Sequence, residues 1–176
     1  GRVGDWFAAN LFNLEPDLIT FAKGVTCGYA PLGGVVAAPH IAAPFFDQPG
    51  MIFRHGYTYS GHTTACVAGL KVMDIIEREG LLDRAAQLEG EIYDALAPLE
   101  NLEHVASVRR GVGALAAVQL EAGDDETLPG RAATACREAG VLTRAMGGGS
   151  LQVSPPLTMT PDQVTEMSTL FAAGLS

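Results

Sequence analysis

The sequence predicts an α/β protein, and three observations support this class. Segments with the spacing of strands and segments with the spacing of helices alternate along the whole chain. Hydrophobic residues make up 48% of the 176 residues and charged residues 18%, which is enough apolar material to bury a sizeable core. No apolar run reaches the roughly 18 residues that a membrane-spanning helix needs.

The first third of the chain alternates short apolar runs with turns. Residues 1–15 are predicted to form a turn followed by a short helical segment. Leu18–Ala22 is a short apolar run and is predicted to be a buried strand. Leu32–Ala38 is small and apolar, as a buried parallel strand would be. The elements that follow are a short helix, a turn and a loop, at residues 39–46, 47–50 and 51–61.

The middle of the chain has helical periodicity. Thr63 or Thr64 is predicted to cap a helix, and after Gly80 a second helix is expected over 81–96. We expect this long helical region to link two domains, which divide the chain between residues 76 and 77.

The last third returns to alternation. Residues 105–120 have the alternating apolar pattern of strands, and a helix is expected over 131–139. Two short strands are predicted at Val141–Thr143 and Leu151–Val153. The last helix should open at Thr160, because Pro161 then takes the first helical position and Asp162 lies in the first turn.

Charge and cysteine content exclude several classes of function. The formal net charge of −9 argues against a nucleic-acid-binding surface, which needs clustered Lys and Arg. The three cysteines are far apart and lack C-x-x-C spacing, so neither a disulfide framework nor a zinc site is indicated. A reducing compartment such as the cytoplasm is the simplest expectation.

Lys23 stands directly after the first predicted strand and opens a glycine-rich loop. An unpaired ammonium in such a place is costly to desolvate. Burial lowers the pKa of a lysine, and the neutral amine is the form that attacks a carbonyl group to make a Schiff base. The local pattern leaves a second interpretation open, in which Lys23 extends from the strand end into water.

The wider segment decides between these two interpretations. PDLITFAKGVTCGYAPLGG (residues 16–34) resembles the active-site segment of class III aminotransferases, the pyridoxal phosphate enzymes of the ornithine, 4-aminobutyrate and omega-amino acid group. The resemblance covers nearly the whole chain and continues through HGYTYSGHTTAC, EREGLL, GVLTRA and SPPLTMT, which begin at residues 55, 77, 140 and 154. It implies fold type I of these transferases, as in aspartate aminotransferase. Residues 1–76 would end the large cofactor domain, and 77–176 would form the small C-terminal domain.

The resemblance also implies a role for individual residues. Lys23 corresponds to the lysine that anchors pyridoxal phosphate and later moves a proton on the substrate. Thr58 corresponds to a threonine that binds the cofactor phosphate of the neighbouring subunit, which implies a homodimer with shared active sites. Tyr57, through its side chain or its backbone N–H, is expected to join Thr58 as a cofactor contact. Arg144 corresponds to an arginine that grips a substrate carboxylate, although an internal salt bridge is its structural alternative.

The function implied is a ping-pong transfer of an amino group from an amine or omega-amino acid to a keto acid such as pyruvate. The turn Gly1–Gly4 resembles one in the middle of the family's large domain, so we expect the chain to be the C-terminal part of a longer enzyme and to be inactive alone. Two alternatives share the fold: an aminomutase similar to glutamate-1-semialdehyde aminomutase, and a catalytically inactive dimerisation module.

Three other patterns invite different functions. Residues 111–116 fit the dinucleotide fingerprint G-x-G-x-x-A, but they run into an alternating strand pattern rather than a helix. Ser60 and His62 suggest a hydrolase, yet no G-x-S-x-G surrounds the serine. The four histidines lack the spacing of a metal site, and we expect none.

Overall fold

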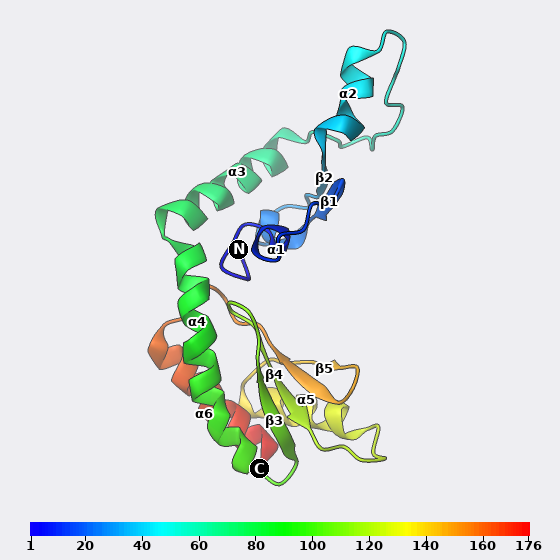
Figure 1. Cartoon of the computed structure of the whole chain (residues 1–176). Helices are drawn as coiled ribbons and strands as arrows, with labels where there is room; N and C mark the ends of the chain where they lie inside the picture. The colour runs from blue at the N-terminus through cyan, green and yellow to red at the C-terminus, as the bar shows by residue number, and fades with distance from the viewer. The chain divides into compact units, whose positions relative to one another are not determined.

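The computed structural model describes all 176 residues and forms two compact units (Figure 1). One unit consists of residues 8–79. The other combines the first seven residues with residues 80–176. The division into a large and a small domain remains a prediction about the whole protein.

The unit 8–79 contains two short strands, two short helices, a 3₁₀ turn and one helix of 16 residues. Its elements are α1 (Ala8–Leu11), β1 (Leu18–Phe21), the 3₁₀ helix η1 (Lys23–Val25), β2 (Gly34–Ala37), α2 (Pro39–Asp47) and α3 (Thr63–Arg78). The strand and helix positions expected from the sequence are confirmed here to within a few residues. The cap of α3 is different: His62 is the N-cap residue, and its Nδ1 accepts a hydrogen bond from Ala65 N at 3.2 Å. The expected cap at Thr63 or Thr64 is therefore wrong.

The pairing and burial of β1 and β2 also differ from expectation. The two strands pair antiparallel, with Leu18 opposite Ala37 and Phe21 opposite Gly34. Parallel neighbours need a long crossover connection, usually a helix, whereas the link here holds only a glycine-rich turn and η1. A sheet of two strands cannot bury both faces, and neither strand has a fully buried residue.

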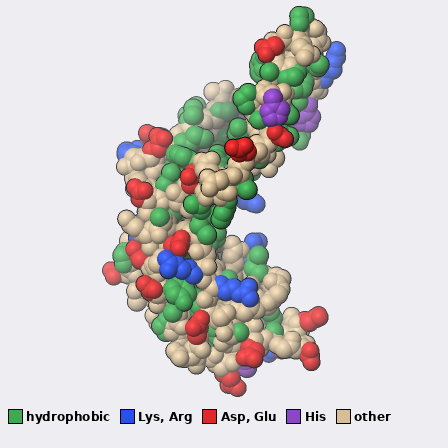
Figure 2. All heavy atoms as spheres, in the orientation of Figure 1, with side chains coloured by type: hydrophobic (Ala, Val, Ile, Leu, Met, Phe, Trp, Pro, Cys, Tyr) green, Lys and Arg blue, Asp and Glu red, His purple; other side chains and the backbone are tan.

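Hydrophobic side chains consequently lie at the surface of the unit 8–79 (Figure 2). Ala65 is its one buried hydrophobic residue. The side chains of Phe12, Phe46 and Phe53 are all more than half exposed. The hydrophobic core of the chain therefore belongs to the other unit.

That second unit places helices against a four-stranded sheet. Its elements are α4 (Leu81–Leu96), η2 (Ala97–Asn101), β3 (Val105–Arg110), β4 (Ala116–Leu120), α5 (Leu128–Ala139), β5 (Ala145–Met146), β6 (Ser150–Val153) and α6 (Pro161–Leu175). The strands lie in the order β3-β4-β6-β5 and all pairs are antiparallel. α4 packs on β3 and β4, α5 packs on β5 and β6, and α6 contacts both helices.

The core follows from the periodicity of each element. On α4 the buried residues recur every three or four positions, as one face of a helix requires, and on β4 they alternate. α6 contributes a third apolar stripe. These buried side chains are Ala85, Leu88, Ile92 and Leu96 from α4, Ala116, Val118 and Leu120 from β4, and Val164, Met167 and Phe171 from α6.

One predicted strand of this unit is wrong. Val141–Thr143 has no strand structure, and β5 begins two residues later, at Ala145. Thr143 joins β6 through its side chain instead, because Thr143 Oγ1 donates to Gln152 O at 2.8 Å. Regular pairing with β6 starts only after this contact.

Two further features hold the second unit together. Arg2 Nη1 donates to Ala114 O at 3.1 Å and also to Pro155 O, so the first turn of the chain is fastened to two distant segments. A Cβ on Gly113 would lie 2.4 Å from Arg2 O, and the φ of +62° also favours glycine. Only glycine fits where this first turn docks.

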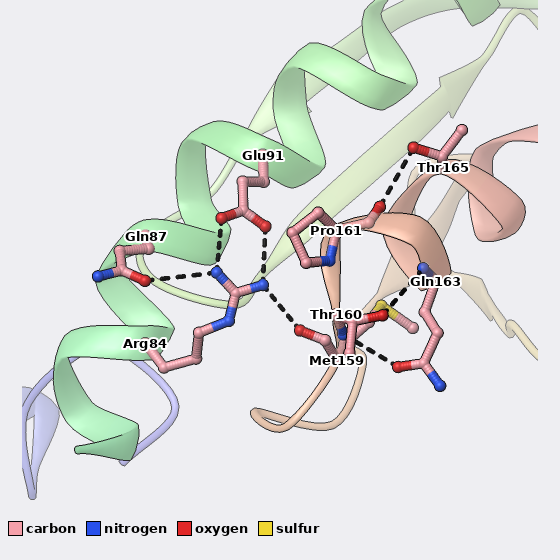
Figure 3. A network of polar contacts seen from close by, with 8 residues as sticks. All are labelled: Arg84, Gln87, Glu91, Met159, Thr160, Pro161, Gln163 and Thr165. Atoms are coloured by element: carbon pink, nitrogen blue, oxygen red, sulfur yellow. Dashed lines mark hydrogen bonds and ion pairs between the residues drawn. The ribbon is translucent and has the colours of Figure 1, made fainter. Parts of the chain in front are cut away.

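The second feature is a polar network between α4 and the start of α6 (Figure 3). Arg84 binds both carboxylate oxygens of Glu91, at 2.5 and 2.7 Å, and donates to Met159 O at 2.7 Å. Beside it, Thr160 and Gln163 form a capping box at the N-terminus of α6, which confirms the helix start predicted from the sequence.

Candidate active site

Lys23 follows β1 in an unusual backbone conformation. Ala22 is extended, and Lys23 then turns to a φ of +52°, the left-handed region that few residues other than glycine adopt. Such a conformation costs about 1–2 kcal/mol and is typical of functional sites. The lysine is exposed in this chain, so of the two interpretations of the local pattern the buried one is not observed. Its amine has no hydrogen bond or ion pair, and with residues 20–22 it lines an open hollow of about 440 Å³.

The loop after Lys23 is fixed by contacts that need particular residues. The buried Thr26 donates from Oγ1 to Ala30 O at 2.5 Å. A Cβ on Gly34 would lie 2.5 Å from the ring of Phe21, its partner on β1, so a larger residue there would force this ring to move. The sequence indicated a glycine-rich loop in this segment, but it did not indicate the role of Thr26.

Tyr57 and Thr58 lie in a tight turn before α3. Tyr57 N donates to Ser60 Oγ at 2.8 Å, and Ser60 N donates to Tyr57 O at 2.9 Å. The Thr58 hydroxyl makes no hydrogen bond within the chain, and the turn is closed by the Ser60 hydroxyl instead. The Tyr57 side chain is 78% exposed and its ring meets that of His55 edge-on. The Thr58 hydroxyl and the Tyr57 side chain are therefore accessible, whereas the Tyr57 N–H is occupied by Ser60.

Arg144 lies in the second unit, directly before β5. Its Nε donates to Gln152 Oε1 at 2.6 Å, and it forms no salt bridge with any acidic residue of the chain. The internal salt bridge considered as its alternative is thus absent. The guanidinium is exposed and retains its Nη donors for another group.

No hydrogen bond or ion pair within this chain joins the candidate site residues to one another. Lys23, Tyr57 and Thr58 share the unit 8–79, where no hydrogen bond joins Lys23 to either of the others, and Arg144 belongs to the second unit.

Gly111–Leu115 is the turn of the β3–β4 hairpin, so the dinucleotide fingerprint opens no helix. No group of three or more His, Cys, Asp or Glu could hold a metal ion, and no helix is long and apolar enough to cross a membrane.

A family model described as aminotransferase class-III matches residues 1–175. The chain therefore belongs to the class III aminotransferase family, and the resemblance read from its motifs is confirmed.

Individual relatives agree with this assignment. An omega-aminotransferase of Caulobacter vibrioides is 38% identical over 95% of the chain and 38% of that protein. A mitochondrial gamma-aminobutyrate transaminase of Oryza sativa is 28% identical over 99% of the chain and 36% of that protein. An amine transaminase from an uncultivated Pseudomonas species, solved in its PLP-bound form, has a TM-score of 0.88 at 37% identity and covers 99% of the chain and 41% of that structure. The chain thus spans about two fifths of each relative, and the predicted fold class is confirmed.

Proposed function

We propose that this chain carries the cofactor-anchoring lysine and the carboxylate-binding arginine of a pyridoxal phosphate-dependent aminotransferase. The enzyme would move an amino group from an amine or omega-amino acid to a keto acid such as pyruvate. The observation that carries the proposal is Lys23, a strained residue with an unpaired amine that lines an open hollow in a chain of this family.

The chemical groups that this chain offers are those that pyridoxal phosphate needs. Pyridoxal phosphate needs a primary amine for its aldehyde carbon and hydroxyl or backbone N–H donors for its phosphate. Lys23 supplies an amine that no acidic residue of the chain holds, and Thr58 supplies a hydroxyl with no partner. When bound, the cofactor would act as a sink for the electron pair that the substrate carbon releases.

Each residue has a separate task in this reaction. Lys23 Nζ would hold the cofactor and, when free, would take the proton from the substrate carbon that carries the amine. The Thr58 hydroxyl and Tyr57 would bind the cofactor phosphate. Arg144 presents its Nη donors to the carboxylate of the keto acid, whose two oxygens match a guanidinium.

Borohydride labelling of the holoenzyme tests the anchor. Reduction in the presence of pyridoxal phosphate should attach the cofactor to Lys23, as peptide mass spectrometry would show, and Lys23→Ala should abolish the label. Lys71 is the one other lysine of this chain and is ion-paired with Asp74 at 2.5 Å, so Lys71→Ala is the matched control and should retain the label. If the wild-type holoenzyme takes no label, the proposal is wrong and the protein keeps the family's fold without its chemistry, as an inactive module would.

Turnover assays distinguish a transaminase from an aminomutase. The transaminase needs a keto acid as second substrate, and its turnover should stop when pyruvate or another acceptor is omitted. Continued turnover of a single amino substrate would support the aminomutase instead. The names of the transaminases reported above favour the first outcome.

We further propose a homodimer in which Thr58 serves the partner's site. Mixed dimers test this arrangement directly, because one subunit can carry Lys23→Ala and the other Thr58→Val. If sites are shared, one of the two sites in this mixed dimer combines an intact Lys23 with an intact Thr58 and regains normal cofactor affinity. If each subunit completes its own site, no intact site forms and affinity stays low.

The three free cysteines are consistent with a reducing compartment, and we propose the cytoplasm. Mass spectrometry of the protein from cell extract, alkylated before lysis, should find Cys27, Cys66 and Cys136 as thiols. An oxidised pair would contradict this location.

A further inference from the structure

Gln152 is an unusual residue for its place in the sheet. It lies on β6 between Leu151 and Val153, which are both buried in the core. Strand alternation turns the side chain of Gln152 to the opposite face. There it lies across from Arg144, one step beyond the last regular pair of β5 and β6.

Both backbone groups of Gln152, its N–H and its C=O, form hydrogen bonds to the segment opposite. Gln152 N donates to Arg144 O at 3.1 Å, and Gln152 O accepts from Thr143 Oγ1 at 2.8 Å. These two bonds tie Gln152 to the segment that carries Arg144, although that segment is not itself a strand. The distance between the two side chains is therefore set by the backbone.

The side-chain amide is oriented as well. Gln152 Nε2 donates to Ser154 Oγ at 3.2 Å, which directs the amide oxygen towards Arg144. That oxygen, Oε1, accepts from Arg144 Nε at 2.6 Å. The amide thus links Ser154 to the inner edge of the guanidinium.

We infer that Gln152 is a positioning residue that holds Arg144 with its Nη groups free for a substrate carboxylate. A guanidinium has five N–H donors, and Gln152 occupies only the one at Nε. The four at the Nη atoms remain in the fork that pairs with a carboxylate through two parallel hydrogen bonds. A neutral amide leaves the positive charge uncompensated, whereas a carboxylate at position 152 would neutralise it.

Because this pair is exposed, it should affect how Arg144 binds a carboxylate more than how stably the protein folds. Arg144 is exposed and the Gln152 side chain is partly so, and a hydrogen bond in such a place adds little to folding. Its loss should therefore change how well the guanidinium is aimed rather than whether the sheet forms. The inference rests on the proposed carboxylate-binding role of Arg144.

The test compares two acceptors in the holoenzyme: pyruvate, and propanal, an acceptor without a carboxylate. Gln152→Met keeps an unbranched side chain of similar length and removes the acceptor oxygen. We expect the KM for pyruvate to rise about tenfold, the ratio expected when one hydrogen bond to a charged group is lost. The inhibition constant of propionate, a carboxylate that does not react, should rise equally, while kcat and the KM for propanal stay within about twofold.

Gln119→Met is the matched control. Gln119 lies on the neighbouring strand β4, and its amide donates to Gly148 O and Leu120 O rather than to Arg144. This variant should leave the KM for pyruvate and the propionate constant unchanged.

A third variant, Arg144→Ala, distinguishes a failure of the role inferred for Gln152 from a failure of the role proposed for Arg144. If Arg144→Ala raises the KM for pyruvate and Gln152→Met does not, Arg144 binds the carboxylate without help and the inference is overturned. If neither variant affects pyruvate, the proposed role of Arg144 fails first and the inference fails with it. If Gln152→Met impairs propanal as much as pyruvate, Gln152 is merely structural and the inference is also overturned.

Discussion

Arg84→Met should destabilise the second unit by breaking the network that joins α4 to the start of α6 (Figure 3). Arg84 binds both oxygens of Glu91 and also Met159 O, 75 residues away in the sequence. The Arg84 side chain is 19% exposed and that of Glu91 33% exposed. Methionine would keep much of the apolar stem in place and remove every donor.

The size of the effect follows from this partial burial. A hydrogen bond to a charged group contributes about 1.5–3 kcal/mol when it is shielded, whereas an exposed ion pair contributes about 0.2–1 kcal/mol. Arg84 lies between these cases, and its loss also leaves Glu91 and a backbone carbonyl without their partner. We expect a loss of about 2 kcal/mol in the free energy of unfolding, or about 1 M in the urea midpoint.

Tryptophan fluorescence is a specific assay for this unit. Trp6 is the single tryptophan, and it belongs to the same unit as Arg84. Arg131→Met is the control, since Arg131 pairs with Asp125 at 2.6 Å but with side chains 66% and 44% exposed. The control should leave the midpoint unchanged. Equal shifts for the two variants would refute the reasoning that burial, rather than pairing distance, sets the strength of the network.

The same network predicts a pH dependence. The hydrogen bond from Arg84 lowers the pKa of Glu91 below its ordinary value, against a smaller opposing effect of burial. The unfolded chain therefore binds a proton at Glu91 before the folded one does, so this stabilisation is complete above the ordinary carboxyl pKa of about 4.5 and is lost as the pH falls through the lower, folded value. Glu91→Gln should weaken the dependence of the urea midpoint on pH below about 5, and an unchanged slope would show that Glu91 does not contribute to it.

Two further predictions concern buried positions of the second unit. Gly113→Ala should lower its urea midpoint by at least about 1 M, because a Cβ would lie 2.4 Å from Arg2 O at a φ of +62°; a wild-type midpoint would mean that the first turn docks elsewhere. Burial raises the pKa of the Cys136 thiol, so iodoacetamide at pH 8 should label the exposed Cys27 in the folded chain and Cys136 only in urea, as peptide mass spectrometry can measure. Rapid labelling of both cysteines without urea would contradict the buried position of Cys136.

Local signals allowed much of the fold to be predicted from the sequence. Pro161 after Thr160 indicated the start of α6, because both residues satisfy needs of the first helical turn on their own. The periodicity of residues 81–96 indicated α4 for a similar reason. His62 was missed as a cap because histidine is rarely used in that position, and only its distance to Ala65 N reveals the role.

The misjudged features depend on partners that are distant in the sequence. An apolar run such as Leu18–Ala22 predicts a strand, but its burial depends on what covers the sheet, and β1 has only β2 beside it. Lys23 and Arg144 were identified as candidates through the family's motifs. Gln152 could not be, since its relation to Arg144 exists only once β5 and β6 pair.

The order of the chain gives the second unit an unusual assembly problem. Its first seven residues pack against α4, where a Cβ on Gly4 would lie 3.4 Å from that of Ala86. During synthesis these residues leave the ribosome before residues 8–79, and their docking surface follows only after that segment. Closing so long a loop costs conformational entropy, and such non-local contacts form slowly. Trp6 should therefore reach its native environment late in refolding, after α4, on which this turn packs, has formed.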